Sequence, residues 1–118
     1  MTLALGPATK IYLALAPVDM RKGFDGLAAQ VQCVLRRDPF SGHLFLFRGR
    51  RGDWLKGLWW DGSGLMLLAK RLEHGRFVWP QVKDGAMTLT GAQLAMLIEG
   101  LDWSRALVLD DVPRPAAV

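Results

Sequence analysis

The sequence HLFLFRGRRGDWLKGLWWDGSGLMLLAKRL, residues 43–72, contains three apolar runs separated by two glycine-rich turns. The runs, residues 43–48, 53–61 and 65–72, have the length of strands, and glycine-rich connections of this kind are typical of hairpins. They predict a three-stranded antiparallel meander. In the first run leucine and phenylalanine alternate, so both of its faces are apolar, which favours a central strand covered on both sides.

The segment before the meander predicts one strand and one helix. Residues 10–16 (KIYLALA) have strand character, and the run ends at Pro17, which cannot donate to a sheet. Residues 19–35 predict a helix with Asp19 as its N-cap, although two early glycines weaken its first turns. Its apolar face, at helical spacing, would contain Met20, Phe24, Leu27, Ala28, Val31 and either Val34 or Leu35.

The segment after the meander predicts two short strands and a second helix. The strands are expected at residues 76–79 and 86–89, separated by a loop that contains Pro80. Residues 90–93 (TGAQ) match a capping box, and Leu89 and Leu94 occupy the positions of a hydrophobic staple. We expect a helix over 91–99 that Gly100 ends in a left-handed conformation. Its buried face would contain Leu94, Leu97, Ile98 and Leu101.

Length and composition bound the architecture. A chain of 118 residues with 51% apolar and 22% charged residues has the balance of one globular domain. We expect an α+β fold, an antiparallel meander sheet of five or six strands packed by two helices, over residues 1–105, with a flexible tail at 106–118. The single cysteine and the absence of a secretory leader or a membrane-length apolar run favour a cytoplasmic protein.

The positive charge is concentrated in the middle of the chain. The net charge is +4, but residues 36–76 contain nine basic and four acidic residues, which gives +5 there and −1 elsewhere. Alternate connections of a meander lie at the same end of the sheet. Loops 48–52 and 73–76 should therefore form one basic rim, opposite an acidic turn at 61–64. The rim would contain Arg48, Arg50, Arg51, Lys70, Arg71 and Arg76.

A one-sided cluster of arginines is suited to nucleic acid, because each guanidinium can bind a phosphate through two hydrogen bonds. The alternative is that charged hairpin loops simply keep sheet edges soluble and unpaired. Tryptophan can add base stacking. We expect Trp59 and Trp103 in the core and leave the burial of Trp54, Trp60 and Trp79 open. The candidate nucleic-acid-binding residues are Arg48, Arg50, Arg51, Lys56, Lys70, Arg71, Arg76, Trp54 and Trp60.

The sequence contains no recognisable catalytic constellation. The two histidines and the single cysteine follow no metal-ligand spacing, and no phosphate-binding or hydrolase motif occurs. We therefore expect no enzyme activity, cofactor, metal or small-molecule substrate. A small metal-dependent nuclease is the less favoured alternative, and it would require two or more of Asp19, Asp25, Asp53 and Asp61 within about 5 Å of each other.

Five ordered strings carry a family resemblance. They are DMRKGFDGL (19–27), RDPFSGHLF (37–45), FRGRRGD (47–53), LWWDG (58–62) and GRFVWP (75–80). Together they resemble the accessory-protein family, called TnpB, of IS-sixty-six-type bacterial insertion sequences, from residue 11 to residue 103. The resemblance implies work beside a separate, larger transposase that carries the catalytic acids, and it supplies no catalytic residues. Residues 54–57 (WLKG) depart from the more polar residues expected there.

These observations lead to two functional hypotheses. The first is a non-catalytic accessory protein for transposition that binds DNA through the basic rim while another surface docks the transposase. The second is a protein-interaction module whose basic rim meets an acidic patch on the transposase, without DNA contact. Neither hypothesis involves a membrane, and the sequence leaves the oligomeric state open.

Overall fold

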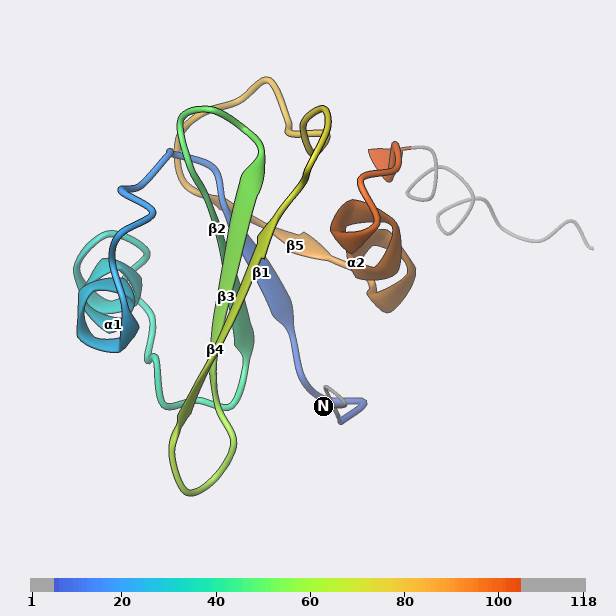
Figure 1. The fold of residues 1–118 in the computed structure, drawn as a ribbon. Coiled ribbons are helices and arrows are strands. Elements are labelled where there is room, and N and C mark those ends of the chain that lie inside the picture. Colours follow the sequence, from blue (N-terminus) through green and yellow to red (C-terminus); the bar gives the residue numbers. More distant parts are fainter. Residues whose placement is uncertain (1–5, 105–118) are drawn as a thin grey trace, which may run out of the picture.

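The strands form one sheet with a helix on each face. A computed structural model describes residues 6–104; residues 1–5 and 105–118, and with them the predicted tail, lie outside the described part. The sheet order is β4-β3-β2-β1-β5, and the α+β class is confirmed (Figure 1). The elements are β1 (Ile11–Ala14), α1 (Phe24–Cys33), β2 (Leu44–Arg48), β3 (Trp54–Trp60), β4 (Leu65–Arg71), β5 (Ala86–Leu89) and α2 (Gly91–Ile98).

The meander of β2, β3 and β4 is confirmed, but the sheet is mixed. β2 pairs antiparallel with β3 and β3 with β4, as the glycine-rich turns predict. β1 pairs parallel with β2, with Ile11 opposite Leu44, and antiparallel with β5. The expectation of a wholly antiparallel sheet is therefore wrong at this one pairing. The reason is that α1 lies between β1 and β2 and returns the chain to the starting end of the sheet, as parallel pairs require.

Two apolar layers enclose β2. Leu44 and Leu46 face α2, while Phe45 and Phe47 face α1, and all four are completely buried. Trp59 and Trp103 are buried in the α2 layer, as predicted. The central, doubly covered position predicted for this strand is confirmed.

Helix α1 begins later than the sequence indicates. It starts at Phe24 with Gly23 as N-cap, whereas Asp19 lies in the preceding loop and bonds to Arg21. Met20 is buried, but from that loop and not from the helix. Phe24 remains 47% exposed, so the buried face is narrower than predicted. Glycines and local side-chain bonds compete with helix formation in this stretch, which explains the late start.

The C-terminal part confirms the second helix and removes one strand. Thr90 and Gln93 form the predicted capping box, and Gly100 has a φ of 77°. Leu101, predicted to be buried, is 53% exposed. Residues 76–79 are not a strand, because they run across the α2 face and bond to the arginine loop instead of pairing along a strand.

Candidate functional site

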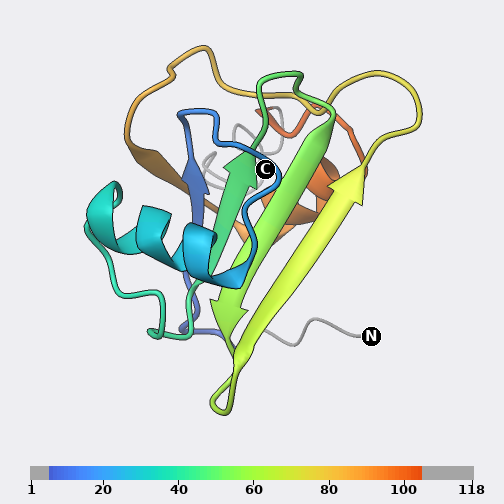
Figure 2. The same ribbon diagram turned by 60° about the vertical axis from the view of Figure 1, so that its left-hand side comes forward.

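Three segments converge at one rim of the sheet, above the ends of β1, β2 and β4. They are residues 17–20 after β1, 49–53 between β2 and β3, and 72–76 after β4 (Figures 1 and 2). The backbone N–H of Val18 donates to the Arg48 carbonyl at 2.9 Å, and that of Leu72 donates to the Asp53 carbonyl at 2.9 Å. The predicted approach of the two hairpin loops is confirmed. The parallel β1 adds the third segment, which the sequence did not reveal.

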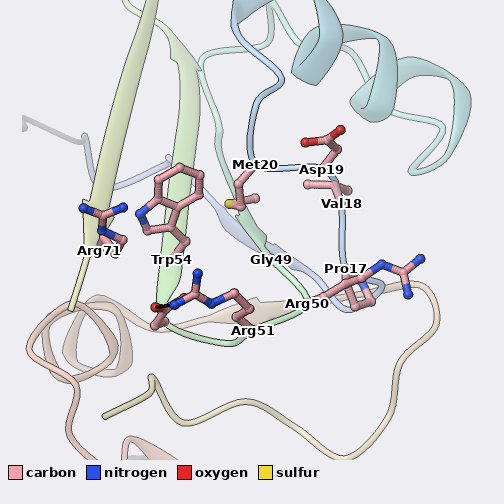
Figure 3. Close-up of a pocket in the computed structure, with 10 residues that line it drawn as sticks. Pro17, Val18, Asp19, Met20, Gly49, Arg50, Arg51, Trp54 and Arg71 are labelled. Carbon is pink, nitrogen blue, oxygen red and sulfur yellow. Dashed lines mark hydrogen bonds and ion pairs between the residues drawn. The ribbon is translucent and has the colours of Figure 1, made fainter. Parts of the chain in front are cut away.

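The converging segments enclose a cleft of about 600 Å³ (Figure 3). Part of its wall is apolar and comes from Pro17, Val18, Met20 and Trp54. The remaining lining residues are Asp19, Gly49, Arg50, Arg51, Asp53 and Arg71. The cleft therefore combines an apolar wall with three guanidinium groups.

Two glycines of the arginine loop are required by its packing. A Cβ atom at Gly49 would lie 2.6 Å from Cγ of Met20, a distance at which one of the two must move. Gly52 has a φ of 80°, in the left-handed region that glycine adopts most easily, and its carbonyl accepts hydrogen bonds from the Phe77 N–H and the Trp79 indole. The string Arg-Gly-Arg-Arg-Gly thus has a structural reason for each glycine.

The cleft contains more positive charge than its own carboxylates neutralise. Arg51 pairs with Asp53 at 3.3 Å, and Asp19 pairs with Arg21, outside the cleft lining, at 2.7 Å. These are the ion pairs found among residues 6–104, so Arg50 and Arg71 have no carboxylate partner there. Arg50, Arg51 and Arg71 are all exposed. An anion entering the cleft would meet two guanidinium groups whose hydrogen-bonding capacity is not used by carboxylates.

The Asp19 carboxylate is held in its ionised form. Hydrogen bonds from the Arg21 side chain, and then from the Arg21 backbone N–H, keep the pKa of Asp19 well below its ordinary value. Its negative charge at the edge of the cleft is therefore permanent near neutral pH, and Arg21 compensates it.

Arg48 does not lie exposed at the rim as predicted. Its side chain is 8% exposed and is packed on the α2 face, with the guanidinium carbon 4.9 Å from the Trp79 ring centroid. Burial lowers the pKa of Arg48 from its ordinary value. The strand alternation that puts Leu44 and Leu46 on the α2 face also puts Arg48 there. Its placement in the predicted interface is wrong for this physical reason.

The two predicted lysines serve the fold. Lys56 Nζ donates to the Lys22 carbonyl at 2.8 Å, just before α1, and Lys70 Nζ donates to the Ile98 carbonyl at 2.8 Å, at the end of α2. Both side chains are partly buried. Their ammonium groups therefore hold a helix terminus to each face of the sheet, and we remove both from the interface.

The open tryptophans have different surroundings. Trp54 lines the cleft and is partly buried, with the Arg71 guanidinium carbon 5.5 Å from its ring centroid. Trp60 lies at the opposite end of β3 and contacts Phe40 edge to face at 5.5 Å, so its assignment to the rim is wrong. Trp79 is partly buried beneath Arg48.

Arg76 lies beside the cleft without lining it. It belongs to a neighbouring hollow of about 360 Å³ that also includes Arg51 and Asp53. Arg51 and Asp53 line both spaces, so the hollow continues the basic surface from the cleft towards residues 72–76.

The carboxylates do not form the arrangement that a metal-dependent nuclease needs. Asp19 and Asp53 line the cleft, whereas Asp61 forms the turn at the other end of β3 and Asp25 lies on α1. Across residues 6–104, no group of three or more histidine, cysteine, aspartate or glutamate side chains is placed to hold a metal ion.

The fold and the cleft define a small basic α+β protein with arginines and a tryptophan gathered at one rim of its sheet. The chain belongs to the IS66 Orf2-like family, whose model matches residues 9–107. It is therefore an accessory protein of an insertion sequence and is related to transposition. Family membership establishes no catalytic function.

Two relatives come from Sinorhizobium fredii (strain NBRC 101917 / NGR234). The chain is 48% identical over 101 residues to Uncharacterized protein y4hO, covering 86% of this chain and 88% of the relative. It is 43% identical over 116 residues to Uncharacterized protein y4jC, covering 97% and 98% respectively. No solved structure matches the chain. Within residues 6–104, no helix is long and apolar enough to span a bilayer.

Proposed function

We propose that this accessory protein binds nucleic acid through the phosphate backbone at the rim cleft and acts beside a separate transposase, without catalysing strand chemistry itself. One observation carries the proposal: three exposed arginines meet at one cleft, and two of them, Arg50 and Arg71, have no carboxylate partner among the described residues. The corrected interface consists of Arg50, Arg51 and Arg71, with Arg76 beside it.

The chemistry of guanidinium groups supports this role. Arginine presents N–H groups in a fork that matches two phosphate oxygens, and it keeps its charge at any physiological pH. Each phosphate that a protein neutralises releases condensed counterions and adds about 0.9 to the steepness of the log–log salt dependence for duplex DNA. Backbone contacts of this kind position a nucleic acid and select little sequence.

The test compares two double variants that remove the same charge. In Arg50→Gln/Arg71→Gln the change lies in the cleft. In Lys10→Gln/Arg36→Gln it lies at exposed positions before β1 and between α1 and β2, remote from the rim. Binding of a labelled DNA duplex is measured over a salt series.

We expect the cleft variant to have a salt slope shallower than wild type by about two units, because two phosphate contacts are lost. The control variant should retain a slope close to that of wild type. Equal losses in both variants would show that only net charge matters, and no binding by wild type at low salt would reject the proposal. In the second case the basic rim would have to meet a protein surface such as an acidic patch on the transposase.

A further inference from the structure

Phosphate binding leaves half of the cleft without a role. The wall formed by Pro17, Val18, Met20 and Trp54 is apolar, and a phosphate gains nothing from it. We propose, on the basis of the function proposed above, that this wall receives an unpaired nucleobase. The preferred ligand is then a single strand, or a strand with one unstacked nucleotide at the cleft.

Trp54 is the surface on which a base would stack. It is the first residue of β3, it is partly exposed, and its indole lines the cleft (Figure 3). The Arg71 guanidinium carbon and the Lys56 ammonium lie 5.5 and 5.9 Å from its ring centroid. Single strands are commonly held by aromatic side chains beside basic groups, because stacking accepts every base while the cations hold the backbone.

The cleft has the size and rigidity of a site for a planar organic group. Its volume of about 600 Å³ lies within the roughly 300 to 1,000 Å³ typical of pockets for small organic ligands. The opposite wall, residues 17–20, is fixed to the end of β2 by the hydrogen bond from Val18 to Arg48. Met20 packs against Gly49 so closely that no Cβ fits between them. The walls therefore come from two parts of the chain that the fold already holds apart.

The arrangement of charge and apolar surface distinguishes a single strand from a duplex. In a duplex the bases are paired and stacked, so only phosphates could reach the rim and the Trp54 wall would stay empty. A strand with a free base can place that base against Trp54 while its flanking phosphates meet Arg50, Arg51 and Arg71. Only this ligand uses both halves of the cleft.

The test uses three labelled ligands of equal length, about 12 nucleotides, which is within the range covered by small single-strand-binding domains. They are an oligothymidylate, a strand of the same length in which every nucleotide is abasic, and a duplex. Thymidine monophosphate is included as a competitor, so that a site for free nucleotides can be told apart from a site for a strand.

The variants keep the arginines unchanged. Trp54→Leu removes the stacking surface, and Trp54→Phe retains an aromatic ring. Gly49→Ala pushes Met20 towards the cleft, because the new Cβ would overlap its side chain. Trp60→Leu is the matched control, since it removes a partly exposed tryptophan from the same strand at the opposite end. Thermal unfolding of each variant checks that it is folded.

We expect wild type to bind oligothymidylate about tenfold more tightly than the abasic strand, the range for one stacked base. Trp54→Leu and Gly49→Ala should lose this preference and keep their binding to the abasic strand, while Trp54→Phe and Trp60→Leu should retain most of it. Thymidine monophosphate should compete weakly.

Each other outcome has a definite meaning. Equal binding of the normal and abasic strands by wild type overturns the inference and leaves the phosphate-binding function intact. Displacement of the strand by an equal nucleotide concentration of thymidine monophosphate overturns it in favour of a free-nucleotide site. If none of the three labelled ligands binds, the function proposed above fails as well.

Discussion

The guanidinium of Arg48 lies over the ring of Trp79, with its central carbon 4.9 Å from the ring centroid, and its Nε and Nη1 atoms have no hydrogen-bond partner among the described residues. Trp79 in turn donates from its indole to the Gly52 carbonyl at 2.9 Å. The two side chains thus pack beneath the arginine loop that forms one side of the cleft. Arg48 supports the loop from below and presents no charge to its surface.

We predict that Arg48→Met is at least as stable as wild type. The change removes two buried N–H groups whose unmet hydrogen bonds cost about 1 to 3 kcal/mol each, against a cation–π contact worth about 1 kcal/mol. Methionine keeps a flexible apolar stem over Trp79. Urea unfolding measures the change, and the salt slope of DNA binding should stay that of wild type. A loss of stability beyond about 1 kcal/mol would contradict this account.

Lys70 is predicted to stabilise the fold and not to bind nucleic acid. Its ammonium donates to the Ile98 carbonyl at the end of α2, where the helix dipole also favours a positive charge. Lys70→Met should lower the free energy of unfolding by about 1 kcal/mol and leave the salt slope unchanged. Lys83→Met, at an exposed lysine, is the control. If instead stability is kept and the slope becomes shallower by about one unit, Lys70 contacts a phosphate.

The turn at Asp61 makes stability depend on acid pH. Backbone N–H groups of Ser63 and Gly64 donate to its carboxylate and lower its pKa from the ordinary value. A carboxylate with a lowered folded-state pKa contributes stability that is fully present above the unfolded value, about 3.9, and is lost as pH falls through the folded value. We expect Tm of wild type to exceed that of Asp61→Asn at neutral pH and the difference to shrink below about pH 4.

The matched control for that measurement is Asp84→Asn. Asp84 is exposed, and no hydrogen bond to its carboxylate is found in residues 6–104. Its substitution should change Tm by a similar amount at every pH. A pH-independent difference for Asp61→Asn would mean that the turn gains nothing from the charge.

Local sequence signals predicted the parts of the fold that depend on local chemistry. The glycine turns of residues 43–72 predicted the meander, and Thr90 with Gln93 predicted the start of α2, because caps and turns are made by neighbouring residues. The parallel pairing of β1 with β2 was missed because nothing local to residues 10–16 distinguishes a parallel from an antiparallel neighbour. As a result the segment 17–20 was not placed at the rim.

The candidate site shows the same division. Alternation along β3 correctly put Trp54 and Trp60 on one face, opposite Trp59. It could not show that seven residues of strand separate Trp54 from Trp60 along the sheet and place only one at the cleft. The two lysines and Arg48 looked like rim charges because their partners, Lys22, Ile98 and Trp79, are distant in sequence.

The pair formed by Asp19 and Arg21 leads to the last prediction, which rests on the proposed binding of nucleic acid. Arg21 neutralises the one carboxylate of the cleft that has no partner within it. Arg21→Gln would leave that charge uncompensated beside the entering phosphates. Two unit charges about 4 Å apart in water interact by about 1 kcal/mol, so binding should weaken about fivefold.

A double-mutant cycle separates this effect from a simple loss of positive charge. Asp19→Asn/Arg21→Gln restores the net charge and removes the repulsion, so its affinity for oligothymidylate should return close to that of wild type. The pKa of Asp19, followed by carboxyl NMR, should rise towards its ordinary value in Arg21→Gln, because the side-chain hydrogen bonds that lower it are gone. If the double variant binds as weakly as Arg21→Gln, Arg21 contacts the nucleic acid directly, and the interface extends past the cleft to residues 19–21.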